Sequence, residues 1–204
     1  MRLSSLSMLL LGLLLFLTCG CDRTPPLPKL SSDAVVLAFG DSLTFGTGAN
    51  PAESYPEVLQ SLLGRRIINA GVPGEVSAEG LQRLPQLLEA NAPELVILCH
   101  GGNDFLRRQP VGEVAANLRA MIELIHARGA AVVLVGVPQP GLTVQPPDFY
   151  PELAKEFALP YEGEILHQLL TDRQFKSDTV HPNAAGYRRL AEALQQLIAR
   201  AQAR

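Results

Sequence analysis

Residues 34–44 read AVVLAFGDSLT, an apolar run that ends at Gly40 and is followed at once by Asp41, Ser42 and Thr44. A short, unbroken apolar run that stops at a glycine predicts a strand buried on both faces of a sheet. Strands of this kind are typical of parallel sheets, whose ligand sites lie beyond the carboxyl ends of the strands. The polar residues that follow residue 39 are therefore the first place to look for chemistry.

The rest of the chain alternates similar apolar runs with longer amphipathic segments. We predict further strands at residues 66–70, 95–99 and 131–137, and a weaker one at 158–161 that Pro160 interrupts. Helical periodicity predicts helices at residues 55–63, 78–91, 111–128, 151–157 and 184–201. This alternation predicts an α/β domain with a parallel sheet and helices on both of its faces.

Length, charge and composition narrow the class of protein. The 204 residues suit one domain, which at this size buries a core without disulfides or metals. Because 17 Lys and Arg stand against 20 Asp and Glu, the chain lacks the basic footprint of a nucleic-acid binder. A hydrophobic content of 47% also excludes a disordered chain.

The N-terminus has the pattern of an export signal. Arg2 precedes the apolar run MLLLGLLLFL at residues 8–17, and the following LTCGC resembles a bacterial lipoprotein cleavage site. We therefore expect residues 1–20 to be a lipoprotein-type signal peptide and Cys21 to be lipidated. Residues 21–32 contain three prolines and are expected to form a tether to a domain at 33–204.

This pattern predicts an exported protein on the periplasmic side of a bacterial membrane. Two alternatives stay open, namely ordinary cleavage to a soluble periplasmic or secreted protein, and an uncleaved membrane anchor. Removal of residues 1–20 takes away Arg2 alone among the charges, which leaves an acidic chain. Anionic lipid does not attract such a chain, so we expect membrane contact only through an N-terminal lipid anchor.

Four polar segments are placed at predicted strand ends or before the last helix. They are Gly40-Asp41-Ser42-Leu43, Asn69-Ala70-Gly71-Val72-Pro73-Gly74, Gly101-Gly102-Asn103-Asp104 and Asp178-Thr179-Val180-His181-Pro182. Together they bring a nucleophile, backbone N–H groups, a side-chain amide and an Asp/His pair to one rim of the sheet. A G-x-S-x-G nucleophile elbow does not fit, because Thr44 replaces the second glycine.

The order and spacing of these four blocks resemble the GDSL, or SGNH, family of serine esterases and lipases. The likeness is greatest to its small bacterial periplasmic arylesterase, thioesterase and lysophospholipase type, and it runs from Phe39 to Tyr187. The resemblance implies a three-layer α/β/α, flavodoxin-like fold with a mostly parallel sheet of about five strands. It also implies hydrolysis of carboxylic esters or thioesters by a Ser-His-Asp acyl-enzyme mechanism.

Carried onto this chain, the resemblance assigns the roles of individual residues. Ser42 is the expected nucleophile, His181 the general base and Asp178 its partner, and the oxyanion donors are the N–H groups of Ser42 and Gly74 and the amide of Asn103. The expected substrates are small acyl esters, thioesters or lysophospholipids, with no nucleic-acid partner. We expect no cofactor, and no spacing of His, Cys and Asp indicates a metal site.

The remaining reactive residues have simpler interpretations. We expect Cys99 to be a buried inert thiol and His100 to have a structural role at a strand end, while His126 and His167 have surface or capping roles. Turn-forming or supporting roles are expected for Asp41, Thr44, Asn69 and Asp104. Loops after Asn103 and after residue 137 should wall the pocket, with Phe105, Leu106, Leu142, Val144 and Phe149 as candidate lining.

Two other functions stay open on these residues. One is deacetylation of acetylated carbohydrates on the same fold, and the other is a non-catalytic binding module tethered to a membrane. The sequence leaves the oligomeric state open.

Overall fold

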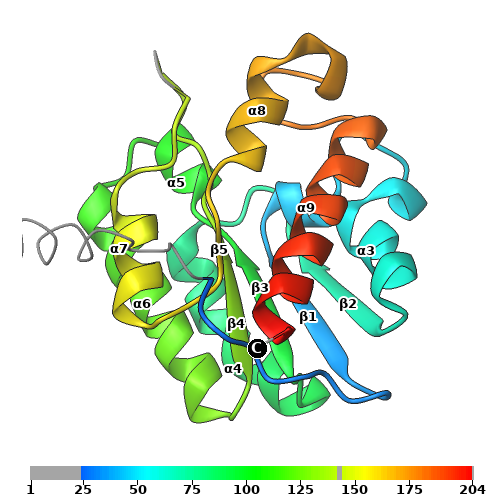
Figure 1. Ribbon diagram of the computed structural model, residues 1–204. Coiled ribbons are helices and arrows are strands. Elements are labelled where there is room, and N and C mark those ends of the chain that lie inside the picture. The colour runs from blue at the N-terminus through cyan, green and yellow to red at the C-terminus, as the bar shows by residue number, and fades with distance from the viewer. Residues whose placement is uncertain (1–23, 142–143, 204) are drawn as a thin grey trace, which may run out of the picture.

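A computed structural model describes residues 24–141 and 144–203 of the chain (Figure 1). In this part of the chain five strands form one sheet in the order β2-β1-β3-β4-β5, and all four pairings are parallel. The strands are β1 (Val35–Gly40), β2 (Arg66–Gly71), β3 (Leu95–Cys99), β4 (Ala131–Val135) and β5 (Tyr161–Glu162). The predicted α/β fold is confirmed, and the sheet is wholly rather than mostly parallel.

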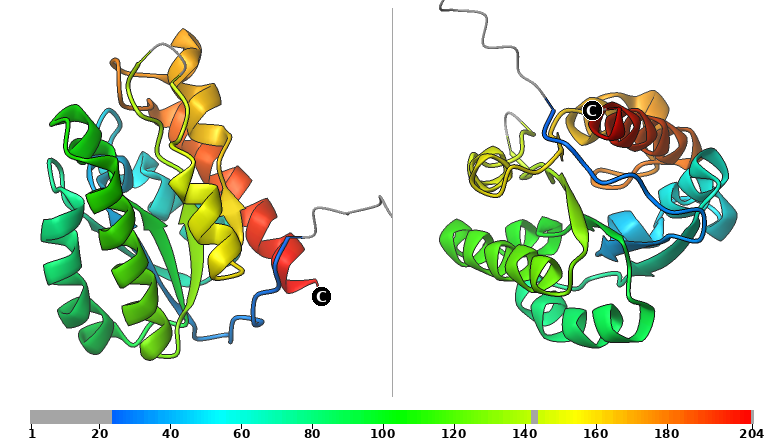
Figure 2. Two further views of the ribbon diagram at one scale, coloured as in Figure 1. Left: turned by 90° about the vertical axis from the view of Figure 1, so that its left-hand side faces the viewer. Right: turned by 60° about the horizontal axis from the view of Figure 1, so that its bottom comes forward.

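Helices cover both faces of this sheet, as Figure 2 shows. One layer is built on the contact between α3 (Tyr55–Leu63) and α9 (Ala184–Gln202), and the other on that between α4 (Ser77–Asn91) and α6 (Val111–Ala127). The shorter elements are α2 (Ser42–Phe45), η2 (Pro51–Glu53), α5 (Gly102–Leu106), α7 (Phe149–Glu156), α8 (Ile165–Thr171) and η3 (Arg173–Phe175). The long helices lie within two residues of their predicted positions.

The core lies between the sheet and the two helical layers. Every residue of β3 is buried, and α9 contributes the predicted stripe Leu190, Leu194, Leu197 and Ile198, all of them buried. The expectation that each main strand is buried on both faces is wrong for β2. Arg66 is exposed and half of this strand is only partly buried, because β2 stands at the edge of the sheet with a neighbour on one side.

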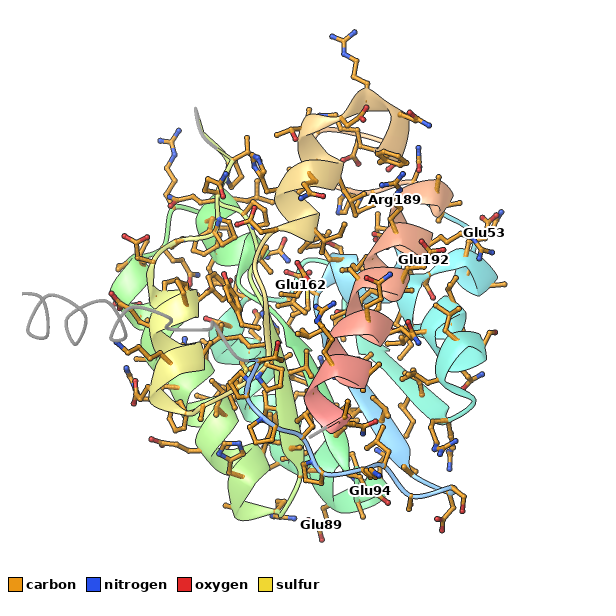
Figure 3. All side chains as sticks on the ribbon, viewed as in Figure 1. Glu53, Glu89, Glu94, Glu162, Arg189 and Glu192 are labelled. Atoms are coloured by element: carbon orange, nitrogen blue, oxygen red, sulfur yellow. The ribbon has the colours of Figure 1, made fainter. Side chains whose placement is uncertain are left out.

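The chain before β1 is packed against the end of the domain opposite the carboxyl ends of the strands. Leu27 is buried, and its N–H donates to the carbonyl of Ala201 at 3.0 Å. The Ser31 N–H donates to Glu94 at 3.0 Å, and Figure 3 shows Glu94 at this end of the molecule. Residues 27–31 therefore lie against the surface of the domain, and their role as a tether stays a prediction.

The expected signal peptide and Cys21 lie outside the described residues. Among residues 24–141 and 144–203, no helix has both the length and the apolar character that crossing a bilayer requires. The domain boundaries at 20 and 32 stay predictions.

Candidate active site

Ser42 is placed by the end of β1, a central strand of the sheet. It is the first residue of α2, directly after the buried Asp41. The Asp41 carboxylate accepts the N–H of Leu43 at 3.0 Å and so caps this short helix. Burial raises the pKa of the Asp41 carboxyl. The turn therefore holds Ser42 at the rim of the sheet, beside the loops that follow β2 and β3.

His181 and Asp178 approach Ser42 from the loop before α9. The Nε2 atom of His181 lies 2.9 Å from the Oγ atom of Ser42, and its Nδ1 atom lies 2.7 Å from Oδ2 of Asp178. The three side chains therefore form one hydrogen-bonded row, although Ser42 and His181 are 139 residues apart in the sequence. The His181 side chain is 17% exposed, which leaves it open to a ligand in the adjoining cavity.

The loop from Lys176 to Pro182 is held in a tight turn by its own backbone. Its two end residues form an isolated antiparallel bridge, and the Ser177 N–H donates to the carbonyl of His181 at 3.0 Å. Asn183 then caps α9 by accepting the Gly186 N–H at 3.0 Å. Pro182 therefore precedes the cap residue of α9 and does not belong to the first turn of that helix.

Both oxygens of Asp178 are used. Oδ1 accepts the backbone N–H groups of Val180 and His181 at 2.8 and 2.9 Å, while Oδ2 faces the His181 ring. Partial burial raises the pKa of this carboxyl, but hydrogen bonds from the His181 ring and from the two N–H groups outweigh it. The net effect lowers the pKa, so Asp178 is an ionised partner for the imidazole.

Gly74 and Asn103 bring hydrogen-bond donors to the same rim. Gly74 has a φ of +83°, a left-handed conformation that favours glycine, and a Cβ atom there would contact no neighbour. Backbone conformation is thus the reason the structure gives for glycine, not crowding by the protein. No hydrogen bond engages the N–H of Ser42 or Gly74 within the described part of the chain, so both are free to bind a ligand.

The amide of Asn103 is held by one of its two hydrogens. Its Nδ2 atom donates to the carbonyl of Glu75 at 3.0 Å, which leaves the second hydrogen for another acceptor. Next to it, the buried Asp104 accepts the N–H and the hydroxyl of Ser77 at 2.9 and 2.6 Å. Asp104 therefore ties α5 to the start of α4, in keeping with the supporting role expected for it.

The predicted supporting residues Asn69 and Thr44 also make internal contacts. Asn69 accepts the Gly71 N–H at 3.0 Å and donates to the carbonyl of Phe45 at 3.3 Å. The Thr44 hydroxyl lies 3.1 Å from that of Tyr55. These contacts hold the loops around Ser42. Neither side chain takes part in the hydrogen bonds that join Ser42, His181 and Asp178.

A charged cluster that the sequence analysis missed lies behind Gly74. Glu75 is 7% exposed, and both of its carboxylate oxygens accept hydrogen bonds of 2.7 Å from Arg83. Its Oε2 atom also lies 3.1 Å from Nε2 of His100. Burial raises the pKa of Glu75, but the bonds from Arg83 and His100 prevail and lower it to about 2. Glu75 follows the glycine motif directly, which is the signal that could have found it.

A cavity of about 590 Å³ opens over Ser42 and His181. Its apolar wall is formed by Leu106, Val137, Pro138, Pro140, Val144 and Leu170. The predicted lining is therefore correct for Leu106 and Val144. It is wrong for Phe105 and Phe149, which are buried outside the lining with ring centroids 6.4 Å apart. Leu142 lies outside the described residues.

The other reactive residues have structural surroundings. Cys99 is a buried free thiol whose pKa is raised well above its usual value by burial. The exposed His126 packs edge-on against Phe157, and His167 donates from Nδ1 to the carbonyl of Val144 at 2.9 Å. In the described ranges, no group of His, Cys, Asp and Glu side chains is arranged to hold a metal ion.

A parallel α/β sheet with this row of side chains at its carboxyl edge has the architecture of a hydrolase that uses serine. The sequence profile of the GDSL-like lipase/acylhydrolase family matches residues 38–189, and the chain belongs to this family. The resemblance carried by the four sequence blocks is thereby confirmed, and the protein is a GDSL/SGNH-type carboxylic ester hydrolase.

Known relatives extend over most of the chain. The esterase TesA of Pseudomonas aeruginosa is 30% identical over 194 residues, which cover 86% of this chain and 93% of that protein. The thioesterase 1/protease 1/lysophospholipase L1 of Escherichia coli K12 is 30% identical over 156 residues, covering 72% and 75%. The solved structure of AlinE4, an SGNH-hydrolase family esterase, superposes with a TM-score of 0.66 at 36% identity and covers 85% and 98%.

Proposed function

We propose that this hydrolase cleaves carboxylic esters or thioesters through an acyl-enzyme formed on Ser42. The observation that carries the proposal is the 2.9 Å contact between Ser42 Oγ and His181 Nε2 at the base of an apolar cavity. A serine hydroxyl becomes nucleophilic when a neighbouring base takes its proton in the transition state. Asp178, which engages the other ring nitrogen, keeps the unprotonated nitrogen turned toward Ser42.

The acylation step follows from these positions. Ser42 Oγ attacks the carbonyl carbon while its proton passes to His181 Nε2, and the carbonyl oxygen becomes an oxyanion. The N–H groups of Ser42 and Gly74 and the free amide hydrogen of Asn103 are the proposed donors to this oxyanion. When the tetrahedral intermediate collapses, His181 gives the proton to the departing alcohol or thiol, and the acyl group stays on Ser42.

Deacylation repeats the sequence with water. His181 takes a proton from a water molecule, whose oxygen attacks the acyl carbon at the same place. The oxyanion is held by the same donors, and its collapse returns the proton from His181 to Ser42 and releases the carboxylic acid. The two halves of the cycle therefore need one base, one set of donors and no further group.

The cavity wall favours an acyl or aryl group as the bound part of the substrate. The side chains of Leu106, Val137 and Leu170 offer carbon surface and no charge, which does not match the hydroxyl groups of a carbohydrate. An acyl ester, aryl ester, thioester or lysophospholipid satisfies this wall. The named activities of the esterase and of the thioesterase/lysophospholipase relatives are in keeping with that substrate class.

A panel of esters tests the substrate class. Because each buried CH₂ contributes about 0.8 kcal/mol, kcat/KM on p-nitrophenyl esters should rise by up to about fourfold per CH₂ as the acyl chain lengthens within the cavity. Aryl acetates, acyl thioesters, lysophospholipids and acetylated sugars complete the panel, measured by initial rates on one preparation. Activity confined to the acetylated sugars would contradict the proposal and establish a carbohydrate deacetylase instead.

We further propose that the protein is exported and held at a bacterial membrane by an acyl anchor on Cys21. The lipoprotein-like pattern around Cys21 supports this location. The segment 24–31 is docked at the end of the domain away from Ser42, as the contact of Leu27 with Ala201 shows (Figure 1). An anchor on Cys21 would therefore hold the domain by the end opposite the cavity.

Replacement of Cys21 by serine tests the anchor. We expect the Cys21→Ser protein to move from the membrane fraction to the soluble fraction after cell lysis, because it has no thiol to acylate. The matched control is Cys19→Ser, which changes the neighbouring thiol and should leave the protein in the membrane fraction. Fractionation followed by immunoblotting measures both. Membrane association of the Cys21→Ser protein would support an uncleaved anchor, and a soluble wild type would support plain secretion.

A further inference from the structure

His100 directly follows β3, at the start of the segment that carries Asn103, and its fully buried side chain reaches the loop that carries Gly74. The backbone N–H of Gly101 donates to its Nδ1 atom at 3.0 Å, so Nδ1 carries no proton. The proton of the neutral ring is therefore on Nε2, which donates to Glu75 Oε2 at 3.1 Å. The ring thus makes one hydrogen bond to each loop.

Each of these bonds ends beside an oxyanion donor. Glu75 is the residue after Gly74, and its carbonyl also accepts the Asn103 amide at 3.0 Å. Gly101 is the N-cap residue of α5, and Asn103 is in the first turn of that helix. The imidazole therefore connects the loop after β2, which carries one donor, to the helix after β3, which carries another.

The ring and its carboxylate partner are held from behind. Arg83 grips Glu75 with two bonds of 2.7 Å, and its guanidinium lies 4.5 Å from the centre of the Phe39 ring. The Tyr150 hydroxyl donates to the carbonyl of His100 at 2.7 Å. These contacts restrict the movement of both the Glu75 carboxylate and the His100 backbone.

The glycine at position 80 independently indicates that the contact between His100 and Glu75 needs space. It lies inside α4, where glycine is a poor helix former. A Cβ atom at this position would lie 2.5 Å from Nε2 of His100 and 3.2 Å from Oε2 of Glu75. Even an alanine would therefore push the imidazole away from the carboxylate.

We propose that His100 is a positioning residue that sets the spacing between the Gly74 N–H and the Asn103 amide through its bonds to Glu75 and Gly101. The inference rests on the proposed acyl-enzyme function and extends it to a residue outside the Ser-His-Asp row. Donors stabilise an oxyanion only when they are fixed where its charge develops, and a displacement of about 1 Å at a reacting centre can cost about 10²-fold in rate.

Three substitutions separate the two bonds of the ring. His100→Leu removes both. His100→Asn places a carbonyl oxygen near the position of Nδ1, and so keeps an acceptor for Gly101 while losing the contact with Glu75. His100→Gln places an amide nitrogen near the position of Nε2, and so keeps the donor to Glu75. The matched control is His126→Asn, the same change on the outer face of α6.

The readout is kcat per active site, with sites titrated by a fluorophosphonate so that misfolded protein is not counted. We expect His100→Leu to lower kcat by about 10- to 100-fold with KM changed less than about twofold, because oxyanion donors act mainly in the transition state. His100→Asn and His100→Gln should fall between this variant and the wild type. His126→Asn should match the wild type.

A double-mutant cycle tests whether His100 acts through the donors. In an Asn103→Ala background, His100→Leu should cost less than about threefold in kcat, because one of the two donors that it spaces is already gone. Gly80→Ala, which keeps the His100 side chain but displaces its ring from Glu75, should lower kcat in the same direction without lowering helix propensity. The kcat of Gly80→Ala therefore tests whether the position of the His100 ring matters, even if His100→Leu fails to fold.

The outcomes are distinguishable. Variants that lower the melting temperature but keep the wild-type kcat per titrated site would show that His100 only stabilises the fold, and would overturn the proposal. Full additivity of His100→Leu with Asn103→Ala would also overturn it. A wild-type protein that hydrolyses no ester or thioester would overturn the proposed function itself, and this inference with it.

Discussion

Replacing Ser42 by alanine should lower kcat for ester hydrolysis by about 10⁴- to 10⁶-fold, the range seen when a serine hydrolase loses its nucleophile. The Ser42 hydroxyl contacts His181 at 2.9 Å, and no other side chain of the described residues offers a hydroxyl to that imidazole. Without Oγ no acyl-enzyme forms. The residual rate is what the oxyanion donors and substrate binding give to direct attack by water.

The Ser42→Ala substitution should impair catalysis and leave the stability of the fold nearly unchanged. The Ser42 hydroxyl makes one hydrogen bond, to a ring that Asp178 and the loop backbone already hold, so the melting temperature should change by little. The measurements are initial rates on a p-nitrophenyl ester, labelling by a fluorophosphonate and thermal unfolding. Labelling should disappear in Ser42→Ala, because the probe forms its covalent bond with the activated hydroxyl.

Ser54 provides the matched control for Ser42. Its hydroxyl is buried close to Gly46, at the end of α2, and finds no hydrogen-bond partner in the described structure. Ser54→Ala therefore removes a hydroxyl a short distance along the chain without breaking a hydrogen bond, and the variant should keep wild-type kcat and labelling. If Ser42→Ala retained activity equal to that of Ser54→Ala, Ser42 would not be the nucleophile.

The fold could be predicted because its central strands are continuous apolar runs. Residues 95–99 (LVILC) are buried along their whole length, and the sequence has no polar residue that would suggest an exposed face. The burial of the edge strand β2 is harder to predict, because Ile67 is buried while Ile68, which looks the same in the sequence, is only partly buried. Burial at an edge depends on the strand order, which a local pattern does not contain.

Short elements escaped prediction for a different reason. The helix α2 has four residues and α5 has five, so neither contains enough turns to show helical periodicity. The α2 helix is held by the local cap from Asp41, and α5 by a tertiary contact, the hydrogen bond between Ser77 and Asp104. These two helices carry Ser42 and Asn103, so the least predictable elements hold part of the candidate site.

The residue pairs of the candidate site also differ in how readily the sequence predicts them. Asp178 and His181 are three residues apart, and one loop brings them together, so a motif could reveal the pair. The contact between His100 and Glu75 joins residues 25 positions apart on loops that follow different strands. Their pairing depends on β1 lying between β2 and β3, and no spacing along the chain encodes it.

Replacing Asp178 by asparagine should lower kcat by about 10²- to 10⁴-fold while leaving the loop folded, because the two oxygens of Asp178 have separate tasks. Oδ1 accepts the N–H groups of Val180 and His181, and the asparagine carbonyl oxygen can keep both of these bonds. Oδ2, which faces Nδ1 of His181 at 2.7 Å, is replaced by an amide that can only donate.

That donor reverses the tautomer of the histidine. With an N–H directed at it, Nδ1 becomes the acceptor, and the ring proton moves to Nε2, which faces Ser42. An Nε2 that already bears a proton cannot take the one on Oγ, so acylation loses its general base although every heavy atom stays in place. The side chain of Asp178 is 52% exposed, so water can compete for these contacts, which places the expected loss below that of Ser42→Ala.

The control for this substitution is Asp172→Asn. Asp172 also accepts a backbone N–H two residues ahead, that of Gln174 at 2.9 Å, but it lies before η3 and makes no hydrogen bond with a histidine of the described residues. Asp172→Asn should therefore keep the wild-type kcat. If Asp178→Asn kept it as well, with its fold intact by thermal unfolding, the histidine would not need a carboxylate to select its tautomer. Asp178 would then act only in forming the turn.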